Sequence, residues 1–285
     1  MRLPKEVLKE VFGFDSFRGL QKEIIEHILD GGDALVLMQT GGGKSLCYQI
    51  PALCLNGITV VVSPLIALMR DQVESLNQLG VRAAGLNSTL TPTEANQVAQ
   101  SMVSGQLDLV YVSPERLLTK TFLDLLNRCD VALFAIDEAH CVSQWGHDFR
   151  PEYLKLTTLH ERFPQVPRLA LTATADGPTR RDILERLSLQ SGRLFVAGFN
   201  RPNIFYRVVP KDNPRKKLLQ FLENEHSGES GIIYHLSRSK VEDTSQWLVD
   251  QGYVALPYHA GMSKKLREKN QDRFFKEEGV IMVAT

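Results

Sequence analysis

Short apolar runs alternate with amphipathic stretches over the first 200 residues, and this alternation constrains the fold more than any other feature. The runs are rich in Val, Leu and Ile with little polar alternation, which is typical of parallel strands covered on both faces. The expected strands are Ala34–Met38, Ile58–Ser63, Leu107–Val112, Val131–Ile136, Arg168–Thr172 and Leu194–Phe199. Helical patterns lie between them at Arg18–Leu29, Leu65–Leu79, Thr91–Val103 and Pro178–Leu189. This order predicts an α/β lobe with a doubly wound, mostly parallel sheet.

The pattern restarts near residue 200, after the polar joint Asn200–Asn203. The expected strands here are Ile204–Val209, Gly231–His235, Tyr253–Pro257 and Val280–Ala284, and the expected helices follow the Lys-rich segment Lys211–Lys217 or lie at Arg238–Asp250 and Ser263–Phe275. We therefore expect two domains: residues 1–200 as a first α/β lobe and residues 201–285 as the N-terminal part of a second. Because domains cluster at about 100–150 residues, the second lobe is expected to be incomplete at Thr285.

Composition excludes several classes of protein. Hydrophobic residues make up 43% and charged residues 23% of the chain, which excludes a wholly disordered chain. No run of apolar residues is long enough for a membrane-spanning helix, and Met1–Phe14 lacks the apolar core of a secretory signal. The four cysteines form no CxxC pair, which argues against a disulfide framework and a zinc cluster. We expect a soluble, cytoplasmic protein.

Net charge gives no indication of a nucleic-acid partner, because 33 Lys and Arg balance 33 Asp and Glu. A local basic groove remains compatible with this balance, since clustered cations act over a Debye length of about 8–10 Å.

A glycine-rich segment joins the expected strand Ala34–Met38 to a helix. It contains Thr40, Gly41, Gly42, Gly43, Lys44 and Ser45. This is the arrangement of a P-loop, in which backbone N–H groups at a helix N-terminus surround phosphate. We expect Lys44 to reach the β- and γ-phosphates and Ser45 to bind Mg²⁺. Met38 stands where the motif GxxxxGK[ST] has its first glycine, and a plain glycine-rich turn is the alternative.

Two acids follow the apolar strand Val131–Ile136, as the second half of a nucleotide site requires. We expect Asp137 to hold Mg²⁺ and Glu138 to orient or deprotonate the attacking water. With Lys44 they are the predicted catalytic residues. The alternative is a pair of solvated acids in a turn.

The segment Asp137–Tyr153 reads DEAHCVSQWGHDFRPEY. It closely resembles the RecQ family of ATP-dependent DNA helicases, in superfamily 2, and the bacterial members best. The resemblance extends over essentially the whole chain. Further matching segments are Thr40–Leu53, Val60–Val73, Ser113–Leu117, Leu171–Ala175, Phe199–Ile204, Gly231–Tyr234, Ser237–Thr244 and Tyr258–Met262. The resemblance implies two RecA-like lobes, ATP and Mg²⁺ as cofactors, and no zinc in this chain, because the family's zinc module would follow Thr285.

Residues before the P-loop resemble that family's adenine-binding segment. We expect the Gln21 amide to pair with the adenine edge, and Phe14 and Arg18 to stack on its ring. The family usually has Pro-Gly where Gly19-Leu20 stand, which weakens the fit of the turn. An exposed amide on a helix is the alternative for Gln21.

The aromatic-rich loop after the acids carries Trp145, His147, Phe149, Arg150 and Tyr153. Exposed aromatic residues can stack on single-stranded bases, a contact worth about 1–3 kcal/mol per base. The resemblance implies that this loop senses DNA and couples it to ATP hydrolysis. The alternative is an aromatic cluster buried under a loop.

Five further residues are candidates for DNA contact or coupling. Ser63, Arg70 and Arg116 could contact the phosphate backbone, which positions a strand without reading its sequence. Thr172 and Thr174 are expected to hydrogen-bond the two acids and link hydrolysis to lobe movement. A plain turn is the alternative.

The resemblance implies a helicase that couples ATP hydrolysis to 3′-to-5′ translocation on single-stranded DNA and unwinds partly duplex DNA in recombination and repair. It would act in the cytoplasm, on the nucleoid, without a membrane partner. The family's arginines that complete the ATP cleft would follow Thr285, so we expect this chain to bind ATP, hydrolyse it slowly and unwind poorly. The alternatives are an ATP- and nucleic-acid-binding fragment, a superfamily 2 RNA helicase, and a P-loop enzyme acting on a small molecule.

Overall fold

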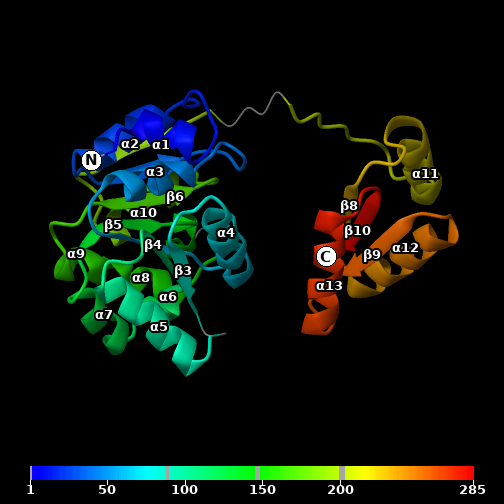
Figure 1. The fold of residues 1–285 in the computed structure, drawn as a ribbon. Helices are drawn as coiled ribbons and strands as arrows, with labels where there is room; N and C mark the ends of the chain where they lie inside the picture. Colours follow the sequence, from blue (N-terminus) through cyan, green and yellow to red (C-terminus); the bar gives the residue numbers. More distant parts are fainter. Residues whose placement is uncertain (1, 88–89, 145–147, 199–202) are drawn as a thin grey trace. The chain divides into compact units, whose positions relative to one another are not determined.

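The computed structural model describes residues 2–87, 90–144, 148–198 and 203–285. They fall into two compact units, Met1–Pro202 and Asn203–Thr285, each of which is an α/β arrangement (Figure 1). In the part of the chain that is described, no helix combines the length and apolar character needed to cross a membrane.

The first unit contains a parallel sheet of seven strands, counted over its described residues, in the order β3-β4-β2-β5-β6-β1-β7. The strands are β1 (Ala34–Leu37), β2 (Ile58–Val62), β3 (Ala83–Leu86), β4 (Leu109–Val112), β5 (Val131–Ile136), β6 (Arg168–Thr172) and β7 (Arg193–Val196). The expected parallel α/β fold is confirmed.

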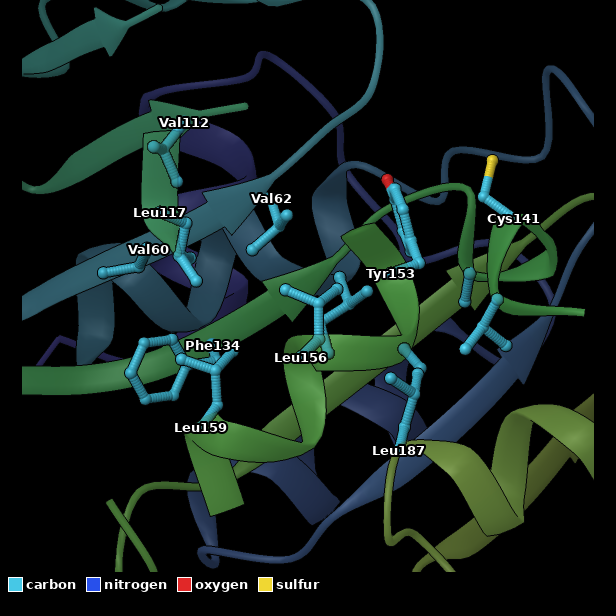
Figure 2. Close-up of a cluster of buried hydrophobic side chains, with 14 of the residues drawn as sticks. Val60, Val62, Val112, Leu117, Phe134, Cys141, Tyr153, Leu156, Leu159 and Leu187 are labelled. Atoms are coloured by element: carbon cyan, nitrogen blue, oxygen red, sulfur yellow. The ribbon is translucent and has the colours of Figure 1, made fainter. Parts of the chain in front are cut away.

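Helices cover both faces of this sheet. They are α1 (Pro4–Glu10), α2 (Gln21–Leu29), α3 (Leu46–Cys54), α4 (Ile66–Gln78), α5 (Pro92–Val103), α6 (Pro114–Leu117), α7 (Lys120–Leu126), α8 (Pro151–Leu154), α9 (Thr158–Arg162) and α10 (Gly177–Arg186), with 3-10 turns η1 (Ala139–Val142) and η2 (Lys155–Thr157). Alternate residues of β1 enter opposite cores: Leu35 and Leu37 pack with α5 to α10, whereas Ala34 and Val36 pack with α2, α3 and α4. Figure 2 shows the first of these cores, where Tyr153, Leu156 and Leu159 lie against the sheet.

The second unit has a three-stranded parallel sheet, within its described residues, in the order β8-β10-β9. The strands are β8 (Gly231–Tyr234), β9 (Val254–Tyr258) and β10 (Val280–Ala284), and the helices are α11 (Pro214–Glu225), α12 (Arg238–Asp250) and α13 (Lys264–Lys276). Apolar residues of α11 and α12 cover one sheet face, while Phe274 of α13 packs against the other.

One expected strand was wrong, and several observed elements, β3 and α1 among them, were not expected. Ile204–Val209 is not a strand: its residues take no regular structure, and Phe205, Tyr206 and Val208 are at least 80% exposed. No described strand lies beside this segment to receive its backbone hydrogen bonds. The edge strand β3 and the helix α1 were missed, since β3 contains Ala83, Ala84 and Gly85 rather than an apolar run.

Candidate active site

The loop between β1 and α3 requires glycine for steric reasons. Gly41 and Gly43 have φ of 79° and 78°, in the left-handed region. A Cβ on Gly42 would lie 2.8 Å from Met38 Cγ and 2.9 Å from the Gln39 carbonyl oxygen. The Met38 N–H donates to the Thr172 carbonyl (3.1 Å), which fixes the start of the loop beside β6. This backbone suits a phosphate-binding loop.

Lys44 lies in this loop with its ammonium turned back onto it. Its Nζ donates to the Met38 carbonyl oxygen at 3.1 Å. A phosphate oxygen would be a stronger, charged acceptor for the same donor. Ser45 follows as the N-cap residue of α3, and Thr40 is exposed at the loop's turn.

Asp137 directly follows β5, and its side chain is partly buried. Its N–H donates to the Val62 carbonyl at 2.9 Å, which continues the sheet to this residue. Burial, and secondarily the charge of Glu138, raise the pKa of Asp137 to about 6, while the Lys44 ammonium opposes the shift. A buried carboxylate beside an acid is stabilised by a cation. Asp137 and the loop therefore fit a Mg²⁺–nucleotide.

Glu138 starts a tight turn with a backbone φ of 49°, which is uncommon for a residue other than glycine. Its N–H donates to Asp137 Oδ1 at 3.0 Å. Such strained backbone persists where the surrounding structure enforces it, often at functional sites.

His140 connects Glu138 to Thr172, the last residue of β6. Its Nδ1 lies 3.2 Å from Glu138 Oε2 and 2.9 Å from Thr172 Oγ1. Thr172 is buried and also donates to the Thr174 carbonyl (3.1 Å), whereas Thr174 is exposed. A direct hydrogen bond from either threonine to the acids stays a prediction. No role was assigned to His140 from the sequence, although its place in the segment Asp137–His140, here called the acid box, was the available signal.

Gln21 ties α2 to the phosphate loop. Its side chain is 2% exposed, so the alternative of an exposed amide is wrong. The amide oxygen accepts from the Arg18 N–H at 2.8 Å, and Nε2 donates to the Gly43 carbonyl at 3.1 Å. Nearby, the Arg18 guanidinium lies 5.7 Å from the ring centroid of the partly exposed Phe14. Adenine contact by these three residues stays a prediction.

The loop after the acid box is only partly described. Trp145 and His147 lie outside the described residues. Phe149 and Arg150 are half-buried. Arg150 donates to the Pro64 carbonyl (3.1 Å) and pairs with Asp148 (3.2 Å). The loop is thereby held against the segment that follows β2.

Tyr153 belongs to the core rather than to a surface for stacking. It is fully buried, and its hydroxyl donates to the Asp137 carbonyl at 2.9 Å. For this aromatic residue the buried alternative is correct (Figure 2).

The candidate phosphate-backbone contacts differ in exposure. Arg70 on α4 and Arg116 on α6 are exposed. Ser63 is 2% exposed, and its hydroxyl has no hydrogen-bond partner among the described residues. Ser63 therefore needs a local rearrangement, or another partner, before it can contact a strand.

The predicted site residues converge because they follow parallel strands. The phosphate loop follows β1, Ser63 follows β2, Asp137 follows β5, and Thr172 ends β6. Carboxyl ends of parallel strands share one sheet edge, which is where open α/β sheets bind ligands.

Comparisons with known proteins agree with this arrangement. The DEAD/DEAH box helicase family model matches residues 18–183, and the helicase conserved C-terminal domain matches residues 213–285. The chain is 51% identical over 280 residues to ATP-dependent DNA helicase RecQ of Pasteurella multocida, covering 98% of this chain and 44% of that protein. It is 39% identical over 283 residues to the protein of the same name from Bacillus subtilis, covering 99% and 48%.

A solved structure adds evidence on the fold alone. The helicase Lhr of Mycobacterium smegmatis, bound to single-stranded DNA and AMP-PNP, matches with a TM-score of 0.67 at 19% identity, covering 96% of this chain and 40% of that one. The chain spans less than half the length of the RecQ relatives just described. It belongs to the DEAD/DEAH box helicase family, and its resemblance to the RecQ helicases is confirmed.

Proposed function

We propose that this chain is the ATP-binding part of a RecQ-type DNA helicase, which couples ATP hydrolysis to 3′-to-5′ translocation on single-stranded DNA and unwinds partly duplex DNA in recombination and repair. One observation carries the proposal. The glycine loop with Lys44 and the Asp137 carboxyl lie at one sheet edge, in a chain 39–51% identical to proteins named RecQ. This arrangement supports ATP binding and hydrolysis of the kind that helicases perform.

Different residues of the chain have different roles at the ATP site. Lys44 neutralises the β- and γ-phosphates, and the N–H groups of Thr40 to Gly43 surround them. Ser45 and Asp137 hold Mg²⁺, which offsets the phosphate charge when bound. Glu138 orients or deprotonates the attacking water.

Adenine and DNA contacts complete the proposal. Phe14, Arg18 and Gln21 form the adenine-binding segment. DNA is contacted by Ser63, Arg70 and Arg116 and by the loop that carries Phe149. Residues 1–200 act as the first RecA-like lobe, and residues 201–285 as the N-terminal part of the second. The protein works in the cytoplasm on nucleoid DNA.

Unwinding is proposed for a protein of the relatives' length. The relatives are more than twice as long as this chain. We expect the 285 residues alone to bind ATP and to unwind poorly, since arginines from the second lobe that reach the γ-phosphate are worth about 10³–10⁵ in rate in related chemistry.

Strand displacement tests this proposal. A protein extended to the relatives' length is incubated with ATP, Mg²⁺ and one of three duplexes. These are a DNA duplex with a 3′ DNA tail, a matched duplex with a 5′ DNA tail, and a matched duplex whose 3′ tail is RNA. The 285-residue chain and the extended Lys44→Ala variant are run in parallel at the same salt. We expect displacement only by the extended wild-type protein, and most on the 3′ DNA tail.

Each other result selects a rival. Equal displacement on DNA and RNA tails would favour an RNA helicase of the same superfamily, since only the 2′-OH differs. Binding without displacement by the extended protein would favour an ATP- and nucleic-acid-binding protein. Displacement by Lys44→Ala would refute the phosphate-loop assignment.

A further inference from the structure

Hydrogen-bonded polar side chains connect α3, the helix that follows the phosphate loop, to α4. Gln49 Nε2 lies 3.0 Å from Gln72 Oε1 and 3.3 Å from the Tyr111 hydroxyl. The Tyr111 hydroxyl in turn donates to the Tyr48 hydroxyl at 3.4 Å. Tyr48 and Tyr111 are each 1% exposed and Gln49 is 6% exposed. Three buried polar side chains, from α3 and β4, therefore meet inside an apolar core and connect to the partly exposed Gln72 of α4.

Packing of this core does not by itself require the tyrosine hydroxyl groups. Tyr48 and Tyr111 share their core with Met69 and Leu76 of α4, and their rings meet edge to face with centroids 6.3 Å apart. Phenylalanine would fill the same space without buried hydroxyls. A buried polar group destabilises a core unless it is hydrogen-bonded, so this set holds together only as a connected network.

One end of the network reaches the nucleotide site. The Ser45 carbonyl, at the start of α3, accepts from the N–H groups of Tyr48 (3.2 Å) and Gln49 (2.9 Å). Burial raises the pKa of Tyr111 to about 12, so its hydroxyl keeps its proton and can donate. A displacement of Ser45 on nucleotide binding would therefore reach Tyr48 and Gln49 through these two hydrogen bonds.

The other end reaches α4. Gln72 lies two residues after Arg70, on the helix that follows Ser63 and Pro64. The Gln49–Gln72 hydrogen bond joins the helix of the phosphate loop to this helix. A shift of α3 at Tyr48 and Gln49 would therefore reach α4 through Gln72.

We propose that Tyr48, Tyr111, Gln49 and Gln72 are positioning residues that tie the placement of α4 to the occupancy of the phosphate loop. Nucleotide binding thereby alters the affinity for single-stranded DNA within the first unit. The inference rests on the proposed function, because it needs a nucleotide at Ser45 and DNA at Arg70.

The test measures coupling rather than activity. Binding of a fluorescent dT oligonucleotide to the 285-residue chain is titrated by anisotropy, with and without saturating Mg²⁺–ADP, and binding of a fluorescent ADP analogue is titrated alone. The variants are Gln72→Met and Tyr111→Phe, which remove one polar partner each. Gln78→Met, an exposed position on the same helix, is the matched control.

In the wild type we expect Mg²⁺–ADP to change the dT Kd by about 5-fold or more. In Gln72→Met and Tyr111→Phe the ratio of the two dT Kd values should fall to about 1, while each ligand alone binds within about twofold of wild type. The double variant should be no worse than either single one, because both interrupt one network. Gln78→Met should keep the wild-type ratio.

Three results would overturn the inference. The ratio is unchanged in both variants; the wild type binds both ligands without coupling; or both variants lose both ligands together with a lowered Tm, which is the signature of a purely structural network. A wild type that binds neither ligand would instead refute the proposed function, and the coupling with it.

Discussion

Asp137 carries a conflict between stability and function at the scale of a single residue. Its pKa is raised to about 6, first by burial and then by the charge of Glu138. In the metal-free protein at neutral pH, the carboxylate is ionised in a place that disfavours charge. A cation removes this conflict, which explains why such a residue persists beside a phosphate loop.

Asp137→Asn is therefore expected to stabilise the metal-free protein near neutral pH. Because the folded-state pKa lies above the unfolded value, the acid contributes stability at low pH that is lost as pH rises through about 6. A shift of about two pKa units corresponds to a difference on the order of 2–3 kcal/mol. In EDTA, the variant's Tm should exceed that of wild type at about pH 7.5, and the two should converge at about pH 4. A Tm difference independent of pH would contradict the assignment.

Glu138→Gln should separate hydrolysis from binding. The amide keeps the shape of the side chain but cannot accept a proton from water. We expect a nucleotide Kd within about threefold of wild type and a loss of hydrolysis of at least about 100-fold. Lys44→Ala is the contrasting variant, because it leaves phosphate charge uncompensated and should lose affinity. Equal loss of nucleotide affinity in both variants would show that the assigned roles are wrong.

At the scale of elements, the phosphate loop depends on its contact with α2. Gly43 has a φ of 78°, and a Cβ there would lie 2.4 Å from Gln21 Nε2. Gly80 has the same φ with nothing within 4 Å of its Cβ position. Comparing alanine substitutions at Gly43 and Gly80 therefore separates the effect of backbone strain from the effect of the contact with Gln21.

Gly43→Ala should consequently destabilise the protein more than Gly80→Ala. The left-handed backbone costs each variant about 1–2 kcal/mol. Gly43→Ala also displaces the Gln21 amide, so we expect an additional loss of about 1 kcal/mol or more and a weaker nucleotide Kd. Chemical denaturation and an ADP titration measure both effects. Equal destabilisation with unchanged ADP affinity would exclude a role for the Gln21 contact.

Phe149→Ala tests the loop after the acid box. If Phe149 stacks on DNA, its loss should reduce DNA stimulation of ATP hydrolysis by about 5-fold or more while basal hydrolysis changes little. Trp145→Ala is the companion variant. A lowered Tm with proportional loss of both activities would support an aromatic residue that only packs.

Sequence patterns predicted elements best where local chemistry and packing agree. The expected helix Thr91–Val103 is α5, and Thr91 caps it, accepting from the Glu94 N–H in a capping box. Strands buried on both faces, such as Val131–Ile136, were also predicted correctly. Ile204–Val209 failed because an apolar run becomes a strand only beside a partner, which local sequence does not specify. The His140–Thr172 and Gln21–Gly43 hydrogen bonds could not be predicted for the same reason, since each joins residues distant in sequence.

For the whole molecule, strand order assembles the site. The order β5-β6-β1 places Thr172 between the strand of Asp137 and the strand of the phosphate loop. Residues more than 90 positions apart thereby share one edge, and His140 can contact Thr172. The zero net charge gives no hint of DNA, so the account relies on this local geometry and on the family.

ATP hydrolysis with and without single-stranded DNA tests the central claim most directly. Phosphate release is measured for a protein of the relatives' length with Mg²⁺ and ATP, alone and with a dT oligonucleotide, beside its Lys44→Ala variant. We predict slow release without DNA, release at least about 10-fold faster with dT, and none above background for Lys44→Ala. Wild-type release at the same rate with and without dT would contradict that claim.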